Sequence, residues 1–100
     1  MVNLQTIGFD VLTEQEKNDF KKIYEEYSNR ISQKIKNIEQ IKIHLKEHNY
    51  KEEIKDKKKK IVIKIFIKIP GRDIEAEAFD WDFKRVLHKA FKRIEQRIGK

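Results

Sequence analysis

The chain has 100 residues, no cysteine and a formal net charge of +7, from 24 Lys and Arg against 17 Asp and Glu. This length allows one small domain over residues 1–100, and the absence of cysteine excludes disulfides, thiolate metal ligands and a cysteine nucleophile. No apolar run exceeds three residues, which excludes a membrane span, and residues 1–5 lack a basic-then-apolar secretion signal. We therefore expect a cytoplasmic protein.

The N-terminal third predicts a strand and then a long helix. Residues 2–7 alternate apolar and polar side chains, which favours a short strand. Thr13 and Glu16 have the spacing of a capping box, so a helix should begin there. Its apolar stripe recurs at three- and four-residue steps over about six turns: Phe20, Ile23, Tyr24, Tyr27, Ile31, Ile35 and Ile38. Glu26 and Arg30, four residues apart in the acid-first order, are expected to pair.

The middle of the chain is ambiguous between helix and strand. Residues 41–45 alternate as a strand would, although the spacing of Ile38, Ile41 and Leu45 also fits a helix. We predict a strand, because β-branched residues alternate with polar ones and Asn37 offers a break before them. Residues 49–60 have no apolar period and predict an exposed Lys-rich loop.

The lysine run 57–60 at the end of this loop has two open interpretations. It either takes part in function or keeps the following isoleucine-rich segment from aggregating.

The clearest strand spans residues 61–69, with five isoleucines on one face. Pro70-Gly71 marks a turn, and residues 72–79 alternate again, so the two segments predict a hairpin. On its outer face Lys64 and Lys68 are expected to meet Glu75 and Glu77 as cross-strand pairs.

Asp82 has the position of a cap for a last helix. The apolar stripe of that helix is Phe83, Leu87, Ala90, Phe91, Ile94 and Ile98. The predicted order is therefore β-α-β-β-β-α, an α+β fold in which a four-stranded mixed sheet has two helices packed on one face. Because a helix connects the first two strands, we expect them to be parallel, with the hairpin added antiparallel.

Enzymatic patterns are few. The three glycines cannot form a dinucleotide fingerprint or a phosphate loop, and Ser28 and Ser32 lack a nucleophile-elbow sequence. Residues 44–48 match the H-x-x-E-H zinc motif, but that motif needs a helix, and here the segment is expected to be a strand without a third ligand. Asp80 and Asp82 are interpreted as a strand exit and a helix cap. We expect no enzyme, no cofactor, no metal and no small-molecule substrate.

The last helix carries the clearest functional signal. Residues 84–100 hold seven Lys and Arg side chains and one acid, Glu95. A merely solvated face would carry acids spaced to pair with these bases, so the pattern favours phosphate binding. His88 lies on the flank of these basic side chains, and we expect it to be exposed to solvent. Three outward aromatic side chains either stack on bases or pack at the sheet edge: Phe66, Phe79 and Trp81.

In order and spacing, these segments resemble the ribosome hibernation promoting factor family, also called ribosome-associated inhibitor proteins, over residues 2–98. The resemblance rests on the segments Leu4–Gly8, Leu12–Glu14, Ile41–Leu45, Pro70-Gly71, Ile74–Ala78 and Asp82–Leu87, followed by Phe91, Arg93, Ile94 and Glu95. It is a resemblance to the short, single-domain form; longer members add a C-terminal dimerisation domain. It implies a four-stranded sheet backed by two helices, similar in shape to a double-stranded RNA-binding domain.

This resemblance implies a non-enzymatic protein that binds the small ribosomal subunit, through ribosomal RNA in the decoding region, and inhibits or preserves idle ribosomes in stress. It carries family bases onto Lys17, Lys22 and Arg93. The charge of the last helix extends this RNA-binding set to Arg85, Lys89, Lys92 and Arg97. Two alternatives stay open: a general module for structured RNA, or a protein–protein adaptor that adds a partner strand at a sheet edge while its basic helix is merely solvated.

Overall fold

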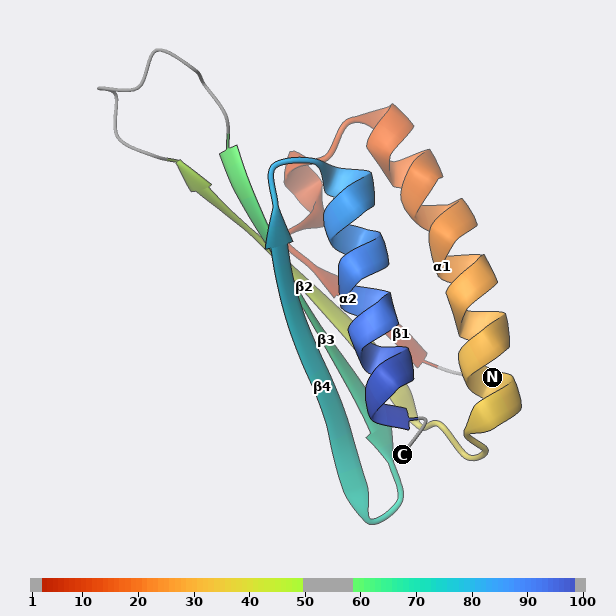
Figure 1. The fold of residues 1–100 in the computed structure, drawn as a ribbon. Helices are drawn as coiled ribbons and strands as arrows, with labels where there is room; N and C mark the ends of the chain where they lie inside the picture. The colour runs from red at the N-terminus through yellow and green to blue at the C-terminus, as the bar shows by residue number, and fades with distance from the viewer. Residues whose placement is uncertain (1–2, 50–58, 99–100) are drawn as a thin grey trace.

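The structure, a computed structural model, describes residues 3–49 and 59–98 and has two layers, a sheet and a pair of helices on one of its faces (Figure 1). The elements are β1 (Asn3–Ile7), the short 3₁₀ helix η1 (Phe9–Val11), α1 (Glu14–Lys34), β2 (Gln40–Asn49), β3 (Lys59–Ile69), β4 (Arg72–Asp80) and α2 (Phe83–Ile98). The predicted α+β class and the β-α-β-β-β-α order are confirmed. Neither α1 nor α2 has the length and apolar composition to cross a membrane.

The four strands lie in the order β1-β2-β3-β4, so β1 and β4 are the edges of the sheet. β1 pairs with β2 in parallel, and the two other pairs are antiparallel, as the connections predicted. The register aligns Leu4, Ile41, Ile67 and Ile74 across the sheet in one row. Because side chains alternate along a strand, every second row faces the helices in this way.

The core fills the space between the sheet and the helices. The buried side chains from the strands are Ile41, Ile43, Leu45, Ile61, Ile63, Ile65, Ile67, Ile74, Ala76 and Ala78. Those from the helices and the segment before α1 are Leu12, Phe20, Ile23, Tyr27, Ile31, Phe83, Val86, Leu87, Ala90, Phe91 and Ile94. α2 packs over β4 and β3, where small Ala76 and Ala78 leave room for the helix. The Tyr27 and Phe91 rings stack at a centroid distance of 4.8 Å and join the two helices.

α1 begins at the predicted capping box, with the Glu16 amide donating to the Thr13 hydroxyl and the Thr13 amide to the Glu16 carboxylate. The prediction that the helix continues through Ile38 is wrong. It stops before Ile35, whose backbone is extended, and Asn37 adopts φ 69°, a left-handed conformation that asparagine tolerates. Ile35 and Ile38 still pack against the core, so their spacing correctly predicted that they are partly buried but wrongly predicted that they are helical.

The strand predicted over residues 41–45 is longer than expected. β2 continues to Asn49 because β3 begins at Lys59 and pairs with it along its whole length. Backbone hydrogen bonds to β3 thus keep a polar stretch extended although it has no apolar period. The Lys-rich loop predicted over residues 49–60 is shorter at both ends, and residues 50–58 lie outside the described residues.

The hairpin register corrects one expectation about charge pairs. Lys64 lies opposite Glu77 as predicted, but Lys68 lies opposite Asp73 rather than a glutamate. Neither lysine is within ion-pair distance of an acid in the described part of the chain. The Lys64 ammonium instead lies 5.0 Å from the centroid of the Phe66 ring, a cation–π contact on its own strand.

Two further predictions fail at the seam where α1 and α2 run side by side in the same direction (Figure 1). Arg30 does not pair with Glu26. Its Nε lies 3.6 Å from a Glu95 carboxylate oxygen of α2, and its guanidinium covers the Tyr27 ring. His88 is half-buried rather than in solvent, with its Nδ1 2.8 Å from the Tyr27 hydroxyl. Both side chains find their partners on the neighbouring helix, which a single-helix pattern does not reveal.

Candidate nucleic-acid interface

Four bases of α2 recur at four-residue steps and therefore form one row on the helix surface: Arg85, Lys89, Arg93 and Arg97. The row follows β4, the edge strand beneath α2. Lys89 contacts Asp80 at the end of β4, and Arg93 contacts Glu77 further back along the strand. As α2 advances, its bases thus pass along the edge of the sheet in the reverse direction to β4.

Lys89 forms an ion pair that supports the fold. Its Nζ lies 2.7 Å from a carboxylate oxygen of Asp80, a side chain that is only 7% exposed. The hydrogen bond from Lys89 holds the pKa of Asp80 below its usual value, and backbone amides of Trp81 and Asp82 add to this effect while burial opposes it. Asp82 accepts from the Arg85 amide and caps α2 as predicted. The two aspartates therefore have the structural roles that the sequence indicated.

Part of the Arg93 guanidinium is also used in a contact within the fold. Its guanidinium donates to the backbone carbonyl of Glu77. Since β4 is an edge strand, this hydrogen bond occupies an acceptor that no neighbouring strand would pair. Arg93 therefore both covers the sheet edge and leaves the remaining donors of its guanidinium available to a ligand.

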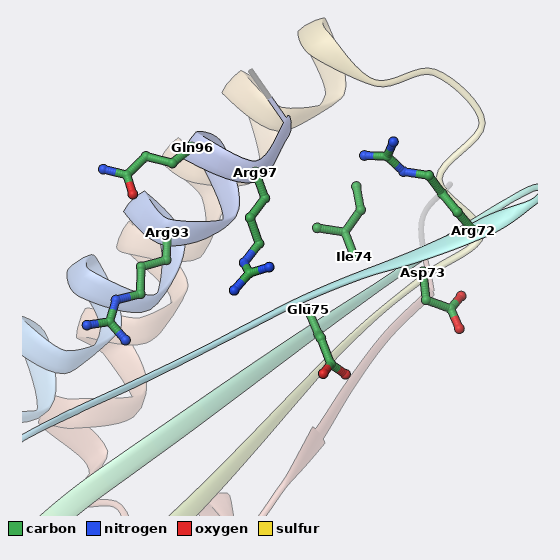
Figure 2. Close-up of a pocket in the computed structure, with 7 residues that line it drawn as sticks. All are labelled: Arg72, Asp73, Ile74, Glu75, Arg93, Gln96 and Arg97. Carbon is green, nitrogen blue, oxygen red and sulfur yellow. The ribbon is translucent and has the colours of Figure 1, made fainter. Parts of the chain in front are cut away.

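Arg93 and Arg97 come together with Arg72, which the sequence analysis missed, around one open groove of about 830 Å³ (Figure 2). The groove lies between the last turns of α2 and the start of β4, and Ile74 and Gln96 complete the lining on this side. In the sequence, Arg72 is one base beside a turn. Only the packing of α2 against β4 brings it next to the last helix.

The charges around this groove are unbalanced. Asp73 and Glu75 belong to the lining segment of β4, but their carboxylates point to the other side of the strand, away from the arginines (Figure 2). Arg72 and Arg97 have no ion-pair or hydrogen-bond partner among the described residues. Guanidinium groups gathered without carboxylates favour a phosphate ligand, which they can bind with two donors each.

The remaining predicted residues vary in how free they are. The side chains of Arg85 and Lys92 on α2 are exposed and unpaired in the described part of the chain, as is Lys22 on α1. Lys17 lies 4.0 Å from Glu14, one turn away on α1. No described contact joins Lys17 or Lys22 to α2, so the structure gathers only the five α2 bases of the predicted set.

The zinc motif of residues 44–48 does not form a site. His44 lies in β2 and His48 is four residues further along the same strand, roughly 13 Å away at the rise of a β-strand. Within residues 3–49 and 59–98, no three His, Asp or Glu side chains come close enough together to hold a metal ion.

No protein-family model and no curated protein matches this chain. Two solved structures share its fold over almost the full length. A ribosomal subunit interface protein from Coxiella burnetii is 19% identical with a TM-score of 0.66, covering 98% of this chain and 94% of that chain. The N-terminal domain of Thermus thermophilus Protein Y is 20% identical with a TM-score of 0.67, covering 98% of this chain and 96% of that chain. Both are members of the hibernation factor family that the sequence resembles, and they show that the chain has this fold.

Proposed function

We propose that this protein binds the small ribosomal subunit through ribosomal RNA in the decoding region, and so inhibits or preserves idle cytoplasmic ribosomes without catalysing a reaction. One observation carries the proposal. Three arginines surround a groove, the two carboxylates of its described lining point away from them, and the bases of α2 continue from it along the helix (Figure 2). The likeness in fold to a ribosomal subunit interface protein supports the choice of RNA.

Binding in this proposal rests on phosphate neutralisation. Each base that pairs with a phosphate releases condensed counterions, which gives strong salt dependence and little reading of sequence. Five bases are free to act in this way: Lys22, Arg72, Arg85, Lys92 and Arg97. Lys89 and Arg93 are positioned by their contacts with β4 and hold the row against the sheet.

Selectivity for the ribosome comes from shape, because phosphate contacts alone do not distinguish one RNA from another. The packing of α2 against β4 presents the row and the groove in fixed relative positions, since residues of these two elements form both. A folded RNA surface that matches this spacing would bind more tightly than a regular duplex.

The test is co-sedimentation of the purified protein with small subunits, at low and moderate salt, with excess duplex RNA as competitor. We expect the protein to pellet with the small subunit despite the competitor. Loss to the competitor would contradict the ribosomal assignment and favour a general module for structured RNA. Absence of binding at low salt would contradict any RNA-binding role and leave the adaptor interpretation.

A further inference from the structure

Within residues 3–49 and 59–98, nothing covers the sheet face opposite the helices (Figure 1), and this face is also basic. The alternation of β2 and β3 places five lysines on this face: Lys42, Lys46, Lys60, Lys64 and Lys68. The acids of the face all belong to the edge strand β4: Asp73, Glu75 and Glu77. No ion pair joins these two sets in the described residues, so the lysines keep their charge for a ligand.

Aromatic rings lie among these lysines. Phe79 and Trp81 are 48% and 50% exposed, and their rings contact each other edge to face at 6.3 Å. The Lys60 ammonium lies 4.2 Å from the Phe79 ring centroid. Packing at the sheet edge would bury these rings, but about half of each remains in solvent. Exposed aromatic side chains gathered on one face mark an interaction site.

Phe66 lies further along the same face, between two shallow hollows. One, of about 160 Å³, is lined by Lys42 and Lys68 together with Asp73, and the other, of about 170 Å³, by Lys46 and Lys64 together with Glu77. Both are smaller than the roughly 300 Å³ and above of enclosed small-molecule sites. Each therefore suits a flat group laid on the sheet, with a phosphate within reach of the lysines beside it.

Positive charge and exposed rings together are what single-stranded nucleic acid requires, because its unpaired bases stack on aromatic faces while its phosphates meet bases. A duplex hides the base faces and would use only the lysines. An acidic protein partner would use the lysines but has no need of the rings. The combination on this face favours the single strand.

We propose that the uncovered sheet face binds single-stranded RNA, with bases stacked on Phe66, Phe79 and Trp81 and phosphates on the lysines of β2 and β3. This is a second surface on the side of the molecule opposite to α2, and it extends the proposed function from structured to unpaired RNA. Its test uses no ribosome, so it and the small-subunit proposal can fail separately.

The experiment titrates a short oligouridylate into the protein and follows the fluorescence of Trp81, which is the chain's sole tryptophan. Stacking on the ring is expected to quench this fluorescence to saturation. Phe79→Ala should weaken binding about 5- to 150-fold, the range typical of losing one stacked base. Val11→Ala is the matched control, because Val11 is also 50% exposed but lies in η1.

Charge variants give an independent readout. Lys46→Glu with Lys64→Glu should weaken oligouridylate binding and reduce its salt dependence by about 0.7 per lost phosphate contact. Lys34→Glu with Lys36→Glu, which changes the net charge equally, should leave oligouridylate binding unchanged, because these exposed residues near the end of α1 belong to neither surface.

Three results would overturn the proposal. The first is the absence of quenching by oligouridylate at low salt. The second is wild-type affinity in a folded Phe79→Ala variant. The third is binding of a short RNA duplex that is as tight as oligouridylate binding and equally sensitive to Phe79→Ala.

Discussion

Reversing two charges on the C-terminal half of α2, with Lys92→Glu and Arg97→Glu together, should weaken binding to the small subunit without harming the fold. Both side chains are exposed and have no ion-pair or hydrogen-bond partner in the described residues. Lys89 and Arg93 are avoided because their contacts with Asp80 and with the Glu77 carbonyl support the fold. A loss of binding in the double variant would therefore support the proposed RNA surface rather than report unfolding.

The expected size of the effect follows from the five free bases, Lys22, Arg72, Arg85, Lys92 and Arg97. Five phosphate contacts at about 0.9 each give a slope of about −4.5 for the logarithm of the binding constant against that of salt concentration. Removing two contacts reduces the slope to about −2.7. A fourfold rise in salt should then weaken the wild-type complex roughly 500-fold and the variant complex roughly 40-fold.

The assay is the anisotropy of fluorescently labelled protein titrated with purified small subunits over a series of salt concentrations. The matched control is Lys34→Glu with Lys36→Glu, which changes the net charge equally at two exposed positions near the end of α1. Thermal unfolding confirms that both double variants are folded. A wild-type slope in the α2 variant, or an equal reduction in the control, would refute the assignment of this surface.

The remaining predictions concern the fold that positions the site. Gly8→Ala should destabilise the protein by at least about 1 kcal/mol more than Gly71→Ala in urea unfolding. Both glycines have positive φ, but only at Gly8 would a Cβ clash with a β2 carbonyl. Equal losses of stability in the two variants would contradict this reasoning. Tyr27→Phe removes the hydrogen bond across the helix seam and should reduce the free energy of unfolding by about 1 kcal/mol, whereas unchanged stability would show that the bond contributes nothing. An NMR titration should find the pKa of Asp80 below that of an ordinary aspartate, and Lys89→Met should raise it. Because the pKa of Asp80 is lower in the folded state than in the unfolded state, its carboxylate stabilises the fold at neutral pH. This stabilisation is lost as the pH falls through the folded-state pKa. An unshifted pKa of Asp80 would contradict the ion pair with Lys89.

Local signals predicted much of the fold. The Thr13 and Glu16 capping box places the start of α1, because both partners lie within one helical turn. The Asp82 cap and the apolar stripe behind it place α2 in the same way. Strict alternation over residues 61–69 predicted β3, since burial on one face repeats every second residue.

The failures came from partners distant in sequence. Arg30 chose Glu95 on α2 over Glu26 on its own helix, and His88 found the Tyr27 hydroxyl. Neither choice can be read from one helix, because it depends on how α1 lies against α2. The extension of β2 to Asn49 also depends on a partner distant in sequence. Backbone pairing with β3 holds this segment extended, although its polar sequence does not predict a strand.

The candidate site was likewise predicted only where its signal is local in sequence. Its bases on α2 were visible as a local excess of charge over residues 84–100. That Lys89 is neutralised by Asp80, and that Arg72 joins Arg93 and Arg97 around one groove, depends on the packing of α2 over β4. Charge density in the sequence thus indicated the kind of ligand, and tertiary structure determined which bases remain free for it.

The most direct test of the central claim is an electron cryomicroscopy map of the protein bound to the small ribosomal subunit at moderate salt. We predict density for the domain in the decoding region, with α2 and the groove of Arg72, Arg93 and Arg97 against ribosomal RNA phosphates. Density at another site on the subunit, or a bound domain with α2 facing solvent, would contradict it.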